Sequence, residues 1–301
     1  MFIYDTVFEN ERQTRDFVME AEKKYKDQVL HVAKQIAKLP NIKFLTLAGP
    51  TCSGKTTTSY ILEQELARLG LTVKIISIDD FYRNRDDIFE DEKPDYESIS
   101  ALDFDVFVDC VGKILDGKTV MLPKFDFRSG HRAGYETYTP QANEIVIFEG
   151  IQAIYPEIVA TIPADTARSI YINAADDVTA YGVFFAGREV RFLRRLVRDY
   201  LFRGASAART LELWEGVVAN EDKNIIPYGK NADFIINSFL TYELNVIKPY
   251  LLDVIKYCDE TPCEVELLAT LREKFRQIPE IPSSFVPSDS VFREFIGNSA
   301  G

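Results

Sequence analysis

Cysteine is scarce in this sequence, and no stretch of it is apolar for long. The four cysteines, Cys52, Cys110, Cys258 and Cys263, are scattered and lack the paired spacing of a zinc site. We interpret them as reduced thiols in a reducing cytosol. No run approaches the roughly 20 apolar residues that a membrane span needs, and residues 1–7 do not resemble the start of a signal peptide. The sequence therefore predicts a cytoplasmic protein without a membrane partner.

Positive charge is also in deficit. Lys and Arg number 35 against 47 Asp and Glu, which gives a net charge of -12. Such a surface repels a phosphate backbone, so nucleic acid is not expected as a partner. The 46% hydrophobic and 27% charged residues are typical of a soluble globular protein. Any phosphate that binds must be met by a local cluster of Lys and Arg.

One segment has the spacing of a phosphate-binding loop. An apolar run leads into Gly49, and Gly54-Lys55-Thr56 then opens a helix-like segment, which gives the pattern G-x-x-x-x-G-K-[ST]. The glycines let successive N–H groups point at phosphate oxygens, and the helix start adds partial positive charge. A chance match in a Gly-Ser turn is disfavoured by the strand before the loop and the helix after it. The segment therefore predicts binding of a nucleoside triphosphate.

Within this loop, Lys55 can reach the outer phosphates and the Thr56 hydroxyl can hold Mg²⁺. The residues expected to surround the nucleotide phosphates are Gly49, Pro50, Thr51, Cys52, Ser53, Gly54, Lys55, Thr56 and Thr57.

Strands and helices alternate from residue 43 onward. The apolar patterns predict strands over residues 43–47, 72–78, 119–122, 144–148, 167–172 and 233–237. They predict helices over residues 9–38, 55–69, 105–115, 187–222, 243–258 and 263–277. The segments 83–100 and 123–132 are expected to be loops. Alternation implies an α/β fold of the phosphate-loop NTPase type, with a mostly parallel sheet and helices on both faces.

We expect three parts along the chain. Residues 1–41 form an N-terminal helical extension and residues 42–240 a phosphate-loop domain. Residues 241–301 supply C-terminal helices and a tail packed on that domain.

Acidic residues follow two of the expected strands. Ligands of such sheets bind beyond the carboxyl ends of the strands, where Asp79, Glu149 and the phosphate loop all fall. Asp79 can accept the proton of an attacking hydroxyl or hold Mg²⁺, although it could instead cap a helix, a role that suits Asp80 equally well. Glu149 ends an apolar strand, where an unpaired carboxylate would be costly, so we expect it to organise Mg²⁺.

Arginines gather in one window of the expected long helix. They are Arg188, Arg191, Arg194, Arg195, Arg198 and Arg203. A charged helix face can be merely solvated, but forked guanidinium groups suit phosphate oxygens, which an acidic chain otherwise repels. We interpret residues 187–204 as a mobile lid with hinges at Gly187 and Gly204. Arg195 and Arg198 would stabilise charge in transfer, and Arg191, Arg194 and Arg203 would bind the nucleotide.

Taken together, the motifs resemble those of the uridine kinase and phosphoribulokinase family, and most of all those of uridine/cytidine kinases. The matching pieces are Ala48-Gly-Pro-Thr-Cys-Ser-Gly-Lys-Thr56, Ile78-Asp-Asp-Phe-Tyr82, Pro123-Lys-Phe-Asp-Phe127, Phe148-Glu-Gly-Ile151, residues 191–199, Arg203-Gly204 and Ala232-Asp-Phe-Ile-Ile236. They occur in the family's order and cover roughly residues 43–240.

The resemblance implies transfer of the γ-phosphate of ATP, or of GTP, to a hydroxyl of a small-molecule substrate. In nucleoside kinases this is the 5′-hydroxyl, and uridine or cytidine would give UMP or CMP in pyrimidine salvage. Asp79 matches the family's catalytic base, Thr56 and Glu149 its Mg²⁺ environment, and the arginines from 191 to 203 its lid. Homo-oligomerisation is left open by the sequence.

On the acceptor side the sequence departs from the family's pattern. Glu97 stands where an Asp usually grips the ribose, Phe125 replaces a Tyr, and His131 is displaced by one position. Tyr82 and Arg132 still fit. The residues expected at the acceptor are Tyr82, Glu97, Phe125, Asp126, His131, Arg132 and Arg191. A sugar, a sugar phosphate or a polyol is therefore an alternative acceptor. A remote alternative to a kinase is a nucleotide-dependent switch or motor.

Overall fold

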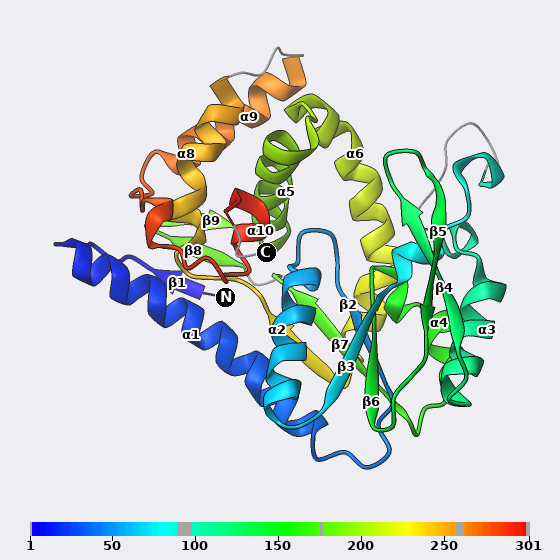
Figure 1. Cartoon of the computed structure of the whole chain (residues 1–301). Helices are drawn as coiled ribbons and strands as arrows, with labels where there is room; N and C mark the ends of the chain where they lie inside the picture. Colours follow the sequence, from blue (N-terminus) through cyan, green and yellow to red (C-terminus); the bar gives the residue numbers. More distant parts are fainter. Residues whose placement is uncertain (1, 89–97, 175–176, 257–261, 299–301) are drawn as a thin grey trace.

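The computed structural model describes residues 2–88, 98–174, 177–256 and 262–298. Its centre is a five-stranded, wholly parallel sheet in the order β10-β7-β2-β6-β3 (Figure 1). The strands are β2 (Phe44–Ala48), β3 (Thr72–Ser77), β6 (Glu144–Glu149), β7 (Ala167–Asn173) and β10 (Phe234–Asn237). The α/β fold expected from the alternation is confirmed.

Strand β2 is central and fully buried, and its side chains alternate between two cores. Leu45 and Leu47 join the core that contains α1 (Glu11–Ile36) and α2 (Lys55–Arg68). Phe44 and Ala48 join the other core, together with α3 (Phe104–Leu115) and α4 (Pro156–Thr161). Because successive strand residues point to opposite faces, one apolar strand supplies both layers.

Helix α1 begins after Asn10, whose side chain accepts a hydrogen bond from Gln13 N at 3.1 Å. It carries an apolar stripe of the expected spacing, including Ala21, Tyr25 and Val29, and packs against α2 and β10. None of the described helices combines the length and apolar character that a membrane span requires.

The expected loop over residues 123–132 is wrong in part. β4 (Val120–Asp126) runs to residue 126 and pairs antiparallel with β5 (His131–Tyr138), with a bulge between Lys124 and Phe125. Along β5, exposed and partly buried side chains alternate, because this ribbon presents one face to solvent. The interspersed Lys, Arg and Glu hid the strands from an analysis based on apolar runs.

A second small sheet was also missed. β1 (Phe2–Tyr4) runs parallel to β8 (Val178–Ala180), which pairs antiparallel with β9 (Val183–Phe185). Strands of three residues are too short to show a period.

The expected helix over residues 187–222 is broken after Arg203. α5 (Gly187–Arg203) ends at Gly204, whose φ of 64° is left-handed, and α6 (Ala207–Asn220) begins after Ser206. A π-helical turn (Glu221–Ile225) and α7 (Ile226–Gly229) follow. The C-terminal region contains α8 (Glu243–Lys256), α9 (Pro262–Phe275), a short 3₁₀ turn (Ser283–Phe285) and α10 (Arg293–Ile296).

Two glycines of this region offer a matched test of the break. Gly204→Ala must place a Cβ in a left-handed conformation, so we expect a loss of about 1 kcal/mol in the free energy of unfolding. Gly216→Ala lies inside α6 with open space around it, so we expect a gain of up to about 1 kcal/mol. Urea unfolding measures both, and equal changes of the same sign would contradict the assignment of the helix end.

Candidate active site

The phosphate loop joins the end of β2 to the start of α2. Gly54 has a φ of 84°, which only glycine adopts at low cost. A Cβ at Gly49 would lie 2.1 Å from the carbonyl oxygen of Ile172, so this residue must also be glycine. The Lys55 ammonium lies over the loop and donates a hydrogen bond to Pro50 O at 3.1 Å. The loop therefore has the tight backbone that cradling phosphates requires.

Asp79 and Glu149 lie beside the lysine of this loop. Ser77, the last residue of β3, is in register with Glu149 at the end of β6, so Asp79 follows directly at the same sheet edge. A Cβ at Gly150 would lie 3.5 Å from Asp79 Oδ1, which confirms the close approach of the two segments.

Burial raises the pKa of both carboxyl groups. The pKa of Asp79 is raised to about 6, mainly by desolvation, with Lys55 acting in the opposite direction. The pKa of Glu149 is raised to about 7 by desolvation and by the charges of Asp79 and Glu294, against Lys55. Two carboxylates that repel each other near neutral pH suit a divalent cation.

The donor set fits Mg²⁺. Mg²⁺ prefers oxygen ligands and is usually held by one or two carboxylates together with substrate phosphates. Asp79, Glu149 and the Thr56 hydroxyl supply such oxygens at one end of the sheet.

Asp80 has a different task from Asp79. Its carboxylate accepts hydrogen bonds from Lys124 Nζ at 2.8 Å and from Phe125 N at 3.2 Å. It therefore connects the turn after β3 to the β4–β5 hairpin. The capping role considered for Asp80 is wrong, because Ser77 occupies the cap position of that turn.

Five of the six arginines of α5 fall into two groups, and the sixth, Arg188, pairs with Asp222. Arg191 and Arg194 are buried and form ion pairs with Glu221 and Glu243, at 2.7 Å and 2.6 Å respectively. They also donate to loop carbonyls, Arg191 to Thr51 O at 3.4 Å and Arg194 to Cys52 O at 3.1 Å. Both side chains therefore hold the backbone of the phosphate loop in place through its carbonyl groups.

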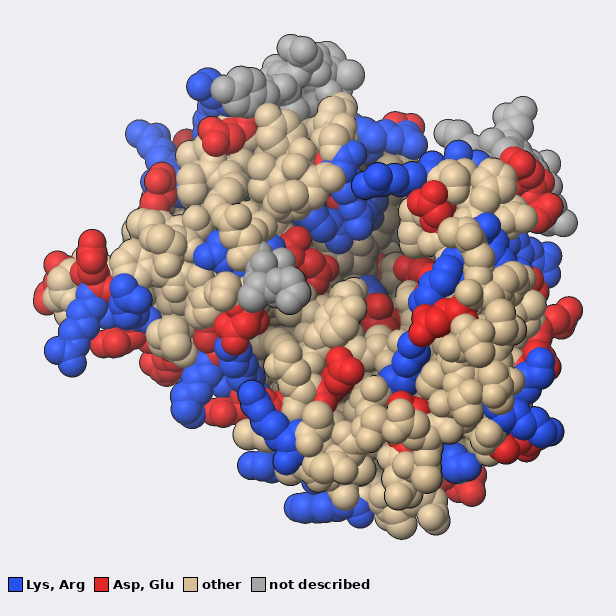
Figure 2. Space-filling view, in the orientation of Figure 1, with Lys and Arg blue, Asp and Glu red and all other residues tan. Residues whose placement is uncertain are grey.

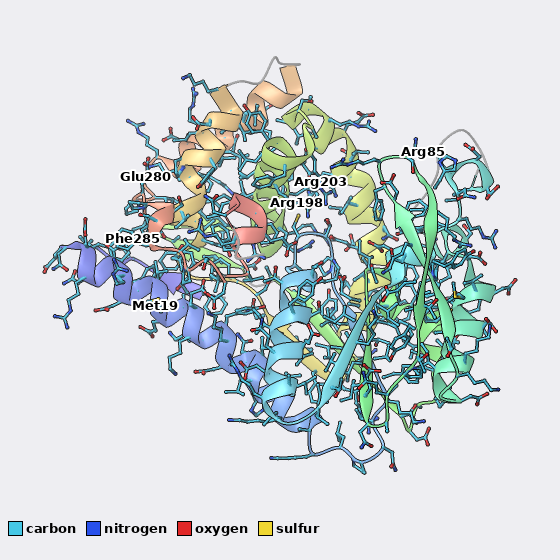
Figure 3. The ribbon with its side chains drawn as sticks, in the orientation of Figure 1. Met19, Arg85, Arg198, Arg203, Glu280 and Phe285 are labelled. Carbon is cyan, nitrogen blue, oxygen red and sulfur yellow. The ribbon has the colours of Figure 1, made fainter. Side chains whose placement is uncertain are left out.

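The second group surrounds Asp199. Arg195, Arg198 and Arg203 lie 3.2, 2.9 and 3.5 Å from its carboxylate. Figure 3 shows Arg198 and Arg203 on α5, and Figure 2 shows Lys and Arg side chains gathered above a hollow of this face. Arg198 is 9% exposed, so the alternative of a merely solvated face is wrong for it. Movement of the lid stays a prediction.

Two of the residues expected at the acceptor, Tyr82 and Phe125, form an aromatic cluster with Phe127. The Tyr82 ring meets Phe125 and Phe127 edge-on at 5.6 and 6.0 Å, and its hydroxyl accepts a hydrogen bond from Gln152 Nε2 at 2.8 Å. The buried Gln152 was missed by sequence reasoning, although a polar residue just after an apolar strand is a recognisable signal.

Three of the other expected acceptor residues, Asp126, His131 and Arg132, lie at the turn end of the β4–β5 hairpin. Arg132 donates to Asp103 at 3.1 Å, and His131 lies 3.2 Å from Asp86, which raises the pKa of the imidazole. Asp126 accepts backbone hydrogen bonds at the hairpin turn, which lower the pKa of its carboxyl group. Glu97 lies outside the described residues.

A cavity of about 780 Å³ lies at the opposite edge of the sheet, where strands begin. Lys43, Gly70 and Glu144 are among its lining residues. It contains none of the phosphate-loop residues.

Comparison with known proteins agrees with this geometry. The sequence model of the Phosphoribulokinase / Uridine kinase family matches residues 44–245. The chain is 28% identical over 200 residues to uridine-cytidine kinase A of Dictyostelium discoideum, covering 66% of this chain and 36% of that protein. It is 30% identical over 193 residues to the uridine kinase of Macrococcus caseolyticus, covering 63% of this chain and 85% of that protein.

A solved structure described as a possible uridine kinase from Bacillus stearothermophilus aligns with a TM-score of 0.49 at 15% identity, over 71% of this chain and all of that one. The phosphate loop and the match to the family model together define a phosphate-loop kinase. The chain belongs to the Phosphoribulokinase / Uridine kinase family.

The raised pKa of Glu149 predicts a pH-dependent stability. The Glu149 carboxyl group has a pKa near 4.5 in the unfolded chain and about 7 in the folded protein. It therefore destabilises the fold progressively as the pH rises from 4.5 to about 7. We therefore expect Glu149→Gln to leave the free energy of unfolding nearly unchanged at pH 4 and to raise it at pH 8, by up to about 3 kcal/mol. Chemical denaturation in metal-free buffer across this range measures the difference, and a difference that is independent of pH would contradict the burial argument.

Proposed function

We propose that the protein transfers the γ-phosphate of ATP to the 5′-hydroxyl of uridine or cytidine, giving UMP or CMP. The single observation that carries this proposal is the meeting of Asp79, Glu149 and Lys55 at one end of a parallel sheet. Membership of the family supports the reaction class. The names of the two relatives support a pyrimidine nucleoside as acceptor.

In the proposed reaction Asp79 is the general base. The acceptor oxygen forms a bond to the γ-phosphorus as its proton passes to the Asp79 carboxylate, and the bond from that phosphorus to the β–γ bridging oxygen breaks to release ADP. A base with a pKa of about 6 is ionised at neutral pH and still binds a proton readily. Asp79, Glu149 and Thr56 would hold Mg²⁺, which neutralises charge on the phosphates.

Cationic groups of the chain would complete the phosphate site. Lys55 would contact the outer phosphates, and the backbone of residues 49–57 would cradle the rest. Arg195, Arg198 and Arg203 would bind the transferring phosphoryl group when that group competes with Asp199 for their guanidinium groups. Arg191 and Arg194 would act by fixing the loop backbone. GTP is a second candidate donor, because the loop reads phosphates and not the base.

A second candidate is a kinase of the same family that acts on another small hydroxyl compound, such as a sugar, a sugar phosphate or a polyol. The observation that favours it is the aromatic cluster. Phe125 packs edge-on against Tyr82 and Phe127 and brings no hydroxyl to the acceptor. On either proposal the enzyme works in the cytoplasm on a small molecule.

Asp79→Asn tests the proposed base. The amide keeps the shape of the side chain but cannot take up the proton, so we expect turnover with uridine and Mg-ATP to fall by about 10² to 10⁴. ATP affinity should stay within a few-fold. Coupled ADP release and calorimetric ATP binding measure the two effects.

Asp109→Asn serves as the control, because Asp109 is exposed and pairs with Lys113 in the next turn of α3. It should leave both quantities unchanged. Near-normal turnover in Asp79→Asn would remove Asp79 from the role of base.

A further inference from the structure

The C-terminal tail, residues 279–298, packs directly on the phosphate loop. A Cβ placed on Gly54 would lie 2.5 Å from Cγ2 of Val291, so the tail closes the space above the loop's last glycine. Three residues further on, Oε2 of Glu294 accepts a hydrogen bond from the Thr57 hydroxyl at 3.2 Å. The family match ends at residue 245, so the tail lies outside the matched region.

The tail is firmly anchored. The buried Arg293 donates to four backbone carbonyls of the tail, those of Ser283, Val286, Pro287 and Gly297. Phe292 and Phe295 are fully buried, and the Phe295 ring lies 4.8 Å from the Arg194 guanidinium.

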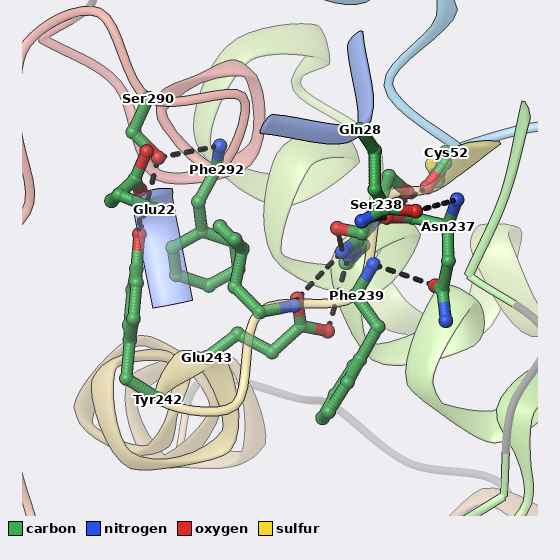
Figure 4. A network of polar contacts seen from close by, with 12 residues as sticks. Glu22, Gln28, Cys52, Asn237, Ser238, Phe239, Tyr242, Glu243, Ser290 and Phe292 are labelled. Carbon is green, nitrogen blue, oxygen red and sulfur yellow. Dashed lines mark hydrogen bonds and ion pairs between the residues drawn. The ribbon is translucent and has the colours of Figure 1, made fainter. Parts of the chain in front are cut away.

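Two further contacts tie the tail to distant helices. Lys26 on α1 pairs with Asp289 at 2.7 Å, and the Tyr242 hydroxyl lies 3.1 Å from Ser290 Oγ, which Figure 4 shows within one polar network. Displacing the tail would break these contacts together, so the tail acts as a fixed wall of the site and not as a removable cover.

Glu294 presents its carboxylate to the region where the nucleotide binds. It belongs to α10 and lies beside Thr57 in the first turn of α2, and its charge acts on Glu149 and on Arg198. A carboxylate only accepts hydrogen bonds, and it repels phosphate oxygens. The part of a bound nucleotide that lies against it must therefore be neutral and must offer donors.

We propose that Glu294 binds the nucleoside half of the donor nucleotide by accepting hydrogen bonds from its ribose hydroxyl groups. The ribose is joined directly to the α-phosphate, so a carboxylate held beside the first turn of the phosphate-loop helix meets the ribose before it meets the base. The pairing of a carboxylate with a ribose hydroxyl is an established mode of nucleotide recognition. This inference rests on the proposed binding of a nucleoside triphosphate at the loop.

Equilibrium binding of ATP, 2′-deoxy-ATP and 3′-deoxy-ATP with Mg²⁺ tests the proposal on the whole chain. A hydrogen bond to a charged group changes affinity by about ten- to hundredfold. We expect the unmodified protein to bind ATP at least about tenfold more tightly than one of the deoxy nucleotides. In Glu294→Ala, ATP should bind about tenfold more weakly, and the preference over that deoxy nucleotide should disappear.

Two variants make the test specific. Glu294→Gln removes the charge with little change of shape, keeps the test valid if the alanine variant does not fold, and should lose part of the preference. Glu280→Gln changes an exposed tail residue that lies 3.6 Å from Lys248, and it should behave like the unmodified protein.

Three results would overturn the inference. These are equal binding of ATP and both deoxy nucleotides by the unmodified protein, an unchanged preference in both Glu294 variants, and tighter ATP binding by Glu294→Ala. The last result would mean that the carboxylate opposes the phosphates. If the unmodified protein bound no ATP at all, the proposed function would fail as well, whereas ATP binding with an unchanged preference would overturn this inference alone.

Discussion

The phosphate loop depends on a buried ion pair behind it. Arg194 is fully buried, pairs with Glu243 at 2.6 Å and donates to the carbonyls of Cys52 and Ser238. Burying two charges is costly, and the cost is offset only when nearly every donor has a partner, as happens here. One guanidinium thus fixes the loop after β2, the loop after β10 and the start of α8 in a single arrangement. Figure 4 shows Cys52, Ser238 and Glu243 converging at this point.

Around this fixed loop, the parallel sheet determines where charge accumulates. β2, β3 and β6 are neighbours, so the loop, Asp79 and Glu149 come together at their carboxyl ends. Burial then raises the pKa of both carboxyl groups, which leaves a site whose negative charge a divalent cation would neutralise. Three arginines of α5, Arg195, Arg198 and Arg203, surround the Asp199 carboxylate. Their guanidinium groups are therefore paired within the chain until an anionic ligand competes for them.

Sequence reasoning found the parts whose physical signal is local. The strands of the central sheet are short apolar runs, and the loop has a fixed spacing, so both were predicted close to their observed bounds. The second half of β4 and the whole of β5 were missed because the exposed face of the hairpin interrupts the apolar pattern. The partners of Arg191 and Arg194 were missed because Glu221 and Glu243 are distant in sequence. The contact of Glu294 with Thr57 spans 237 residues, and no local pattern could indicate it.

The proposed activity of this site is phosphorylation of a pyrimidine nucleoside. The most direct measurement is ADP release from Mg-ATP across a panel of acceptors: uridine, cytidine, purine nucleosides, ribulose 5-phosphate, pantothenate and simple polyols, with a control that lacks an acceptor. The account predicts turnover with uridine or cytidine well above that of every other compound and of the control. Activity confined to a non-nucleoside hydroxyl compound would contradict it, and would mean that the aromatic cluster of Tyr82, Phe125 and Phe127 recognises a different substrate.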